Sequence, residues 1–277
     1  MALSINTNIM SLNAQRNLTN TQSAMAVSLQ RLSSGLRVNS AKDDAAGLAI
    51  AERMNAQVRG LTVGIRNAND GISLAQTSEG ALGSVTESLQ RMRELAIQAV
   101  NGTNSTTDRA SLDSEFQALD TELSRVINGT TFNGIFVLAG GAGSTVFQIG
   151  PDAGTNNQVT VTTTNMSADS SITAINSSSV TTTGNASTAI ARIDTALDTI
   201  NSERATLGAA QSSIESAIRS LSATRENTAA ARGRIMDADF AMETASLTRA
   251  QILQQAGISM LAQANQSPQI VLSLLQG

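Results

Sequence analysis

The strongest constraint on the fold is an apolar repeat in the second half of the chain. Between residues 190 and 221, positions spaced alternately three and four residues apart are apolar in eight of ten cases. This spacing holds one stripe on one side of an α-helix and is typical of coiled-coil packing. At the helical rise per residue, such a helix would extend about 50 Å. We therefore expect a rod-like helical protein, with a seam through Ile190, Ile193, Leu197, Ile200, Arg204, Leu207, Gln211, Ile214, Ile218 and Leu221.

The first half of the chain carries stripes of the same kind. Residues 82–99 and 112–126 each show helical apolar spacing, and a polar break over residues 101–107 separates them. This pattern predicts two helices joined by a loop. The predicted fold class is mainly α: a long antiparallel helical bundle or coiled-coil rod formed by the N- and C-terminal halves, with a small β-hairpin region in the middle.

The middle of the chain has different signals. Asn133-Gly134 favours a tight hairpin turn, Gly150-Pro151 marks another turn, and residues 158–164 are rich in β-branched side chains. These features predict a β-hairpin region over about 132–164. Residues 165–186 are rich in Ser and Thr, a composition that predicts a short, exposed surface excursion.

Composition excludes most kinds of catalytic site. The chain has no His and no Cys, which removes the commonest general base, the usual zinc ligands and the thiol nucleophile. We expect no catalytic residue, no metal site and no cofactor. The pairs Asp43 with Asp44 and Asp237 with Asp239 are interpreted as helix caps rather than acid–base pairs. A net charge of -4, with Lys42 as the one lysine, argues against a nucleic-acid partner.

Both ends of the chain are almost free of charge. Arg16 is the one charged residue from 1 to 30, and residues 250–277 contain none. Polar residues and Pro268 interrupt the C-terminal stretch too often for a transmembrane helix, so we expect no membrane insertion. The N-terminus lacks the features of a secretory signal peptide. Burial of one face of an isolated helix does not offset the cost of ordering it.

We therefore expect the two ends to pack together as the dry centre of an assembly. A buried unpaired charge would cost several kcal/mol there, which explains why charges are missing. The simpler alternative is an ordinary intramolecular helix pair that covers both ends. In the assembly interpretation, the packing residues are Ile5, Ile9, Leu12, Met25, Leu29, Leu32, Leu253, Met260, Leu261, Val271, Leu274 and Leu275.

Several long strings of the sequence resemble bacterial flagellin. They include "MALSINTNIMSLNAQRNL", "RLSSGLRVNSAKDDAAGLAIAERM", "LQRMRELAIQ", "TTFNG", "RIMDADFAMETA" and "QILQQAGISMLAQANQSPQIVLSLL", in the order of that family. The resemblance covers about residues 1–141 and 187–277. It implies a filament subunit in which residues 1–42 with 244–277 form the inner core. Residues 43–186 with 187–243 would form a rod domain, and the excursion at 165–186 would replace a large variable outer domain.

The resemblance also implies how such a subunit reaches its place. It would be exported unfolded through the flagellar type III apparatus, held by a chaperone at its C-terminal segment, and secreted into the extracellular filament. Filament cap and hook–filament junction proteins would be partners besides the chain itself. Two alternatives are the junction protein itself and a secreted translocator that inserts apolar helices into membranes.

Two surface features follow from the resemblance. The segment "LQRMRELAIQ" resembles the part of flagellin that an animal Toll-like receptor recognises, with Leu95 on a stripe beside the core and Glu115 close to it. The contrasting interpretation is a subunit contact or a solvated face. Receptor candidates are Gln90, Arg91, Arg93, Glu94, Leu95, Gln98 and Glu115. Candidates for O-linked sugars are Ser170, Ser171, Thr173, Ser177, Ser178, Ser179, Thr181, Thr182 and Thr183.

Overall fold

The computed structural model describes residues 7–275, with side chains described for residues 7–266. The helices in this part of the chain are α1 (Ile9–Ser34), α2 (Ala45–Val100), α3 (Thr106–Gly129), α4 (Ser170–Asn176), α5 (Thr183–Met236) and α6 (Phe240–Leu275). The strands are β1 (Thr131–Phe132), β2 (Ile135–Phe136), β3 (Ser144–Gln148) and β4 (Gln158–Thr162), with short 3₁₀ helices at Thr155–Asn157 and Met166–Ala168. The predicted fold class, mainly α with a small β region in the middle, is confirmed.

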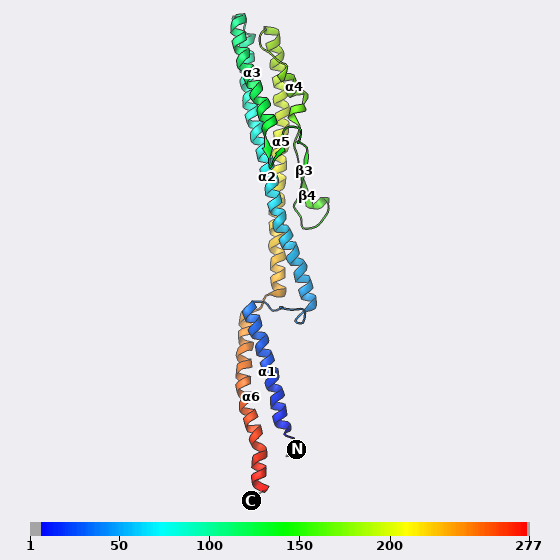
Figure 1. Ribbon diagram of the computed structural model, residues 1–277, viewed down its shortest axis with the longest axis vertical. Coiled ribbons are helices and arrows are strands. Elements are labelled where there is room, and N and C mark those ends of the chain that lie inside the picture. The colour runs from blue at the N-terminus through cyan, green and yellow to red at the C-terminus, as the bar shows by residue number, and fades with distance from the viewer. Residues whose placement is uncertain (1–6, 276–277) are drawn as a thin grey trace. The chain divides into compact units, whose positions relative to one another are not determined.

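The chain divides into two compact units. One consists of residues 1–56 with 227–277, and the other of residues 57–226. Helices α2 and α5 contribute to both units. In the unit of residues 57–226, which we call the bundle unit, α2, α3 and α5 lie side by side (Figure 1).

The bundle unit has a continuous apolar core. The apolar members of the predicted α5 seam are buried or partly buried in it. The two polar members, Arg204 and Gln211, both approach Glu79 of α2, with N···O distances of 3.7 and 3.1 Å. Polar contacts of this kind favour one register between paired helices. The largest fully buried side chains include Leu82, Leu89, Met92, Leu95, Phe116, Leu123, Ile127 and Ile193.

The predicted polar break forms the loop between α2 and α3. Ser105 caps the N-terminus of α3 in a capping box with Asp108. The guanidinium of Arg109 donates hydrogen bonds to the carbonyl oxygens of Ala99 at 2.8 Å and Asn101 at 3.1 Å. These bonds satisfy carbonyl groups at the C-terminal end of α2, which have no partner within the helix. The loop therefore ends one helix and starts the next with local hydrogen bonds.

The β region consists of two antiparallel hairpins. Asn133 (φ 50°) and Gly134 (φ 79°) form the turn between β1 and β2, as the Asn-Gly pair predicts. Strands β3 and β4 form the second hairpin. Its end lies against α2 at Gly64, where an added Cβ would sit 1.8 Å from the carbonyl oxygen of Ile149. Only glycine permits this close approach.

The Ser/Thr-rich segment is more buried than its composition predicts. It contains α4, and Ile172, Ile175 and Val180 are buried in the bundle core. The backbone N–H of Val180 donates to the Asp113 carboxylate at 2.7 Å, and Arg192 donates to the carbonyl oxygen of Ala174 at 2.9 Å. The expectation of an exposed surface excursion is therefore wrong for these three aliphatic residues, which anchor the segment to the bundle, whereas residues 181–185 are exposed.

In the other unit, α1 and α6 lie side by side and run in opposite directions (Figure 1). Gly35, in the left-handed conformation at φ 71°, ends α1. The chain then pairs with the end of α5, where the N–H of Arg37 donates to the carbonyl oxygen of Met236 at 2.6 Å. Met236, Val38 and Ala51 form a small buried cluster beside this connection.

Two of the four paired aspartates, Asp44 and Asp239, cap helices. The Asp44 carboxylate accepts a hydrogen bond from the N–H of Gly47 at 2.8 Å, and that of Asp239 accepts one from Ala241 at 2.9 Å. The Ser40 hydroxyl and nearby backbone N–H groups donate to the exposed Asp43 carboxylate, which lowers the pKa of Asp43. The cap prediction is confirmed for Asp44 and Asp239, whereas Asp43 accepts its hydrogen bonds from residues 39 and 40 in the turn before α2. Asp237 differs, since its backbone forms an isolated bridge with Leu36.

Candidate functional site

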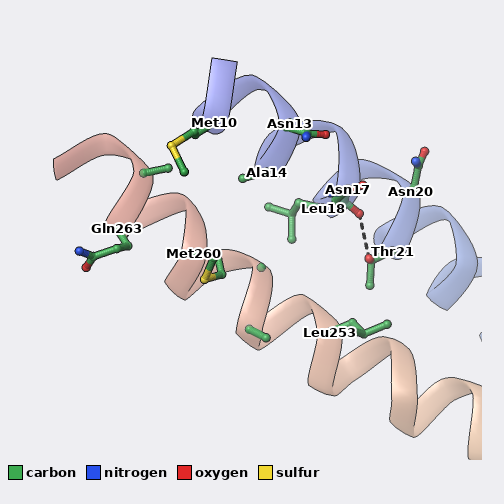
Figure 2. Close-up of a pocket in the computed structure, with 13 residues that line it drawn as sticks. Met10, Asn13, Ala14, Asn17, Leu18, Asn20, Thr21, Leu253, Met260 and Gln263 are labelled. Atoms are coloured by element: carbon green, nitrogen blue, oxygen red, sulfur yellow. Dashed lines mark hydrogen bonds between the residues drawn. The ribbon is translucent and has the colours of Figure 1, made fainter. Parts of the chain in front are cut away.

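A groove of about 750 Å³ lies between α1 and α6 (Figure 2). No lining residue is charged. Leu18 of α1 approaches Gly257 of α6 closely, since an added Cβ on the glycine would lie 3.5 Å from a Leu18 methyl group. The groove fits an uncharged, largely apolar group. Its lining consists of Met10, Asn13, Ala14, Asn17, Leu18, Asn20, Thr21, Leu253, Ala256, Gly257, Met260, Gln263 and Ala264.

Large aliphatic side chains around the groove are exposed. Ile9 and Met260 are 65% and 64% exposed, and Leu12, Leu29 and Leu253 are exposed by half or more. Full burial of each such side chain stabilises by about 1.5–3 kcal/mol. Of the other predicted packing residues, Met25, Leu32 and Leu261 are partly buried. Ile5 lies outside the described residues, as do the side chains of Val271, Leu274 and Leu275.

Polar contacts hold α1 and α6 together. The Asn8 amide donates to the carbonyl oxygen of Ala264 at 2.7 Å, and the Ser11 hydroxyl donates to the Asn265 side chain at 2.8 Å. Arg31 pairs with Glu243 at 3.7 Å near the other end of α1. These polar contacts join the two helices beside partly buried large side chains such as Leu18 and Leu261.

The α1–α6 pair does not cover the apolar ends of the chain. Among the described side chains of these helices, the buried ones are the small residues Ser11, Ser28, Ala250 and Ala264. The simpler alternative was an intramolecular helix pair that covers both ends. Helices α1 and α6 do pair within one chain, but the pair leaves their large aliphatic side chains exposed. One face of each helix is left in contact with water, which is unfavourable for uncharged aliphatic surface.

The seven candidate receptor-contact residues lie at the surface of the bundle unit, except for Leu95. The Arg91 guanidinium donates to Glu115 at 2.8 Å and to Glu94 at 2.9 Å, and these bonds raise the pKa of Arg91. The predicted proximity of Glu115 is confirmed. Leu95 is only 1% exposed, so its predicted place on an accessible stripe is wrong. Its helix packs against both α3 and α5, which buries a wider arc than one stripe.

The remaining receptor candidates are accessible to different extents. Gln90 and Gln98 are exposed. Arg93 is half-buried and pairs with Asp194 of α5 at 2.7 Å, which raises the pKa of Arg93. This part of α2 therefore presents charged groups that are already paired within the chain.

The sugar candidates also differ in exposure. Ser171 and Ser178 are only 9% and 8% exposed, so the expectation that they lie on the surface is wrong. The Ser178 hydroxyl donates to the carbonyl oxygen of Ala174 at 2.9 Å and accepts a hydrogen bond from Arg192 at 3.1 Å. Ser179 is half-buried. The exposed candidates are Ser170, Thr173, Ser177, Thr181, Thr182 and Thr183.

Within the described residues, no three His, Cys, Asp or Glu residues gather as a metal-binding group. No helix in that part of the chain has both the length and the apolar character needed to cross a membrane.

Sequence reasoning missed a set of amides on α1. Asn13, Asn17 and Asn20 follow one another at intervals of four and three residues, line the groove and are exposed. Their side chains make no hydrogen bond within the described residues, whereas Asn8 uses its amide to hold α6. The sequence does contain these amides at helical spacing. The pattern of aliphatic residues, on which the prediction was based, does not include them.

Known proteins resemble this chain over almost its whole length. Residues 5–142 match the family described as the bacterial flagellin N-terminal helical region, and residues 190–275 match its C-terminal helical region. The flagellin of Halalkalibacterium halodurans is 45% identical over 98% of this chain and 99% of its own length. A crystal structure of Bacillus cereus flagellin is 32% identical, with a TM-score of 0.50, over 60% of this chain and 94% of that chain.

A longer relative shows that the middle of this chain is short. Flagellin D of Vibrio anguillarum is 37% identical over 99% of this chain and 100% of its own length. That alignment spans 376 positions, whereas this chain has 277 residues. The Vibrio protein therefore contains segments that have no counterpart here.

Proposed function

The chain belongs to the bacterial flagellin family and is a structural subunit of the extracellular flagellar filament, and we propose that it polymerises through the surface of α1 and α6. In this proposal, the groove and the exposed aliphatic side chains become the interior of the filament. The same surface would be wet and unfavourable in an isolated subunit. Each subunit would then complete its apolar core with side chains from its neighbours.

One observation carries this proposal. The exposed aliphatic side chains, such as Ile9, Leu12 and Met260, lie on a helix pair whose groove has no charged lining residue. Monomeric proteins rarely leave apolar surface of this extent uncovered. A subunit interface explains both the exposure and the missing charge, because an unpaired charge buried there would be strongly destabilising.

A charge placed in the groove tests the proposal. In Met260→Glu, assembly would have to bury an unpaired carboxylate, so we expect no filaments by electron microscopy at neutral pH. Met260→Leu is the matched control and should form filaments normally. Deletion of residues 252–277 should also prevent assembly while leaving the helical circular-dichroism signal of the bundle unit. Normal filaments from Met260→Glu would contradict the proposal.

Export as an unfolded chain is the second part of the proposal. The chain has no Cys, so no disulfide has to be kept reduced during passage. The uncharged α6 segment is a suitable binding surface for a chaperone, since its aliphatic side chains are exposed in the isolated subunit. A pull-down of export chaperone by the full chain, compared with a chain lacking residues 252–277, would test this partner.

Other filament proteins are proposed to use the same helices. The first and last subunits of a filament have unpaired α1 and α6 surfaces, and the hook–filament junction and the filament cap would cover them. The junction protein itself and a membrane-inserting translocator are not favoured as identities of this chain. Binding of cap or junction protein should be lost in Met260→Glu and retained in Met260→Leu.

A host receptor is proposed to bind the bundle unit around Arg91 and Glu115. Their exposed ion pair, with Gln90 and Gln98 nearby, offers hydrogen-bonding groups without prior unfolding. Arg91→Ala should weaken receptor activation by subunits. If the variant instead impaired filament formation alone, the segment would be a subunit contact rather than a receptor site.

Two smaller proposals complete the functional description. The exposed hydroxyls of Thr181, Thr182 and Thr183 are the best-placed acceptors for O-linked sugars. An intact mass of filament protein equal to that of the bare chain would contradict modification.

We also propose that the chain has no enzymatic activity, which is supported by its lack of His and Cys and by aspartates used as caps.

A further inference from the structure

Resting on the proposed function, we infer that α6 of a second copy occupies the groove and that amide side chains fix its register. The outer face of α6 enters the groove, and the alignment is set by Asn13 and Asn17 on one subunit and by Gln251 and Gln255 on the next.

Charge selects the occupant. An incoming helix would be largely desolvated against a lining that offers no opposite charge, so a charged face would be strongly disfavoured. The outer face of α1 carries Arg16, one turn from Leu12. The outer face of α6 carries the exposed aliphatics Ile252 and Ile258 and has no charge from residue 250 onward. This leaves α6 as the favoured occupant.

The groove and the outer face of α6 are different surfaces of the subunit. The groove lies between α1 and α6, while Ile252 and Ile258 are exposed and lie outside its lining. A contact between groove and outer face is therefore heterologous. One copy keeps a free groove and the other keeps a free outer face, so the same contact can repeat without closing on itself. Growth into a filament follows from the geometry of a single contact.

The amides supply the specificity that aliphatic packing lacks. Asn13 and Asn17 are four residues apart, and so are Gln251 and Gln255. In both helices this spacing corresponds to a separation of about 6 Å along the axis. When the helices align, each amide can meet an amide. When they slip, an amide faces an aliphatic side chain and loses its hydrogen bond, which leaves a buried polar group without a partner.

The positions of other amides agree with an approach from outside the helix pair. Asn20 and Gln263 line the groove, and their side chains point away from the opposite helix (Figure 2). They are exposed and thus available to an incoming neighbour. By contrast, Asn8 and Asn265 are already used between α1 and α6 of one chain. The chain thus separates the amides that join its own helices from those that remain free.

A helical reconstruction of wild-type filaments provides the first test. We expect α6 of a neighbour in the groove, with Gln251 and Gln255 amides within hydrogen-bonding distance of Asn13 and Asn17. A groove filled by α1 of a neighbour, by another segment or by water would overturn the inference and leave the proposed function intact. Failure of the wild-type chain to polymerise would instead contradict the proposed function.

A variant pair provides the second test. Asn13→Leu combined with Asn17→Leu makes the groove more apolar, so filaments should still form but should divide between more than one helical symmetry. Gln15→Leu is the matched control, because Gln15 is exposed on α1 outside the groove lining. It should keep the single wild-type symmetry. A double variant with only the wild-type symmetry, or one that no longer polymerises beside a normal control, would overturn the inference.

Discussion

The bundle unit and the α1–α6 pair show two ways in which helices of one chain deal with apolar surface. In the bundle unit, three helices enclose Leu89, Phe116, Ile193 and their neighbours almost completely. In the α1–α6 pair, the fully buried residues among the described side chains are small, and side chains such as Ile9 and Met260 stay exposed. Two helices alone cannot surround a core, whereas three can. The difference indicates that the pair needs further helices to complete its packing.

The distribution of charge follows the same division. The bundle unit keeps charged residues on its helices, and several of them are paired, as in Arg93 with Asp194 and Arg91 with Glu115. These pairs can remain in solvent because the core lies elsewhere. In the proposed assembly a charge on the outer faces of α1 and α6 would become buried, which agrees with the absence of charge from residue 250 onward. Under the proposed function, charge content distinguishes the surface that stays in solvent from the surface that is buried on assembly.

The largest expected effect is a core truncation that compares the two regions directly. Leu89→Ala removes a fully buried side chain from the bundle unit and should lower the free energy of unfolding by about 2–5 kcal/mol. Leu29→Ala removes a half-exposed side chain from α1 and should cost an isolated subunit less than about 1 kcal/mol. Denaturant unfolding at concentrations too low for polymerisation would measure both.

The filament should reverse this order of sensitivity for assembly. Leu29→Ala should raise the concentration needed for polymerisation, by about tenfold for each 1.4 kcal/mol of lost contact. Equal destabilisation of the isolated subunit by the two variants would contradict the comparison, because it would mean that Leu29 is already packed within one chain.

Sequence reasoning predicted the parts of the fold that local chemistry determines. The α5 seam, the loop after α2 and the Asn133-Gly134 turn all depend on spacing or on backbone preferences, and all are confirmed. It failed at Leu95 because that residue is buried by a second neighbouring helix, which no single stripe reveals. It failed at Ile172 and Ile175 because Ser and Thr dominate the segment around them.

The sequence predicted the assembly surface of α1 and α6 but not the groove within it. Exposed aliphatics such as Leu12 and Met260 could be found from the missing charge alone. The groove between the helices, and the exposed position of Asn17 within it, depend on how α1 and α6 pair. That pairing is non-local in sequence, so composition could indicate an assembly surface but not its shape.

An intermediate effect is expected at Glu203, where the bundle unit buries a carboxylate. Its two oxygens accept hydrogen bonds from the backbone N–H of Thr164 at 2.8 Å and the hydroxyl of Thr164 at 2.7 Å. Glu203→Ala should lower the free energy of unfolding by about 1–2 kcal/mol, because charge-assisted bonds are lost. Glu203→Gln keeps one acceptor and should lose less. Equal stability of Glu203→Ala and wild type would contradict this account of how a buried charge is tolerated.

The smallest expected effect is at Asp120 of α3, a half-buried charge without compensation. One of its carboxylate oxygens is buried without a hydrogen-bond partner in the described part of the chain, and desolvation raises the pKa of Asp120 above its ordinary value. A carboxyl group whose pKa is raised on folding opposes folding when it is ionised.

This penalty is present at neutral pH. It disappears as the pH falls through the pKa of Asp120 in the folded chain toward its pKa in the unfolded chain. Asp120→Asn should therefore stabilise the subunit by on the order of 0.5 kcal/mol at pH 7. It should give no stabilisation at pH 3, where the Asp120 carboxyl group is mostly protonated in both the folded and the unfolded chain. Unfolding curves at the two pH values would show this difference, and a gain that persisted at pH 3 would mean that shape rather than charge limits stability at this position.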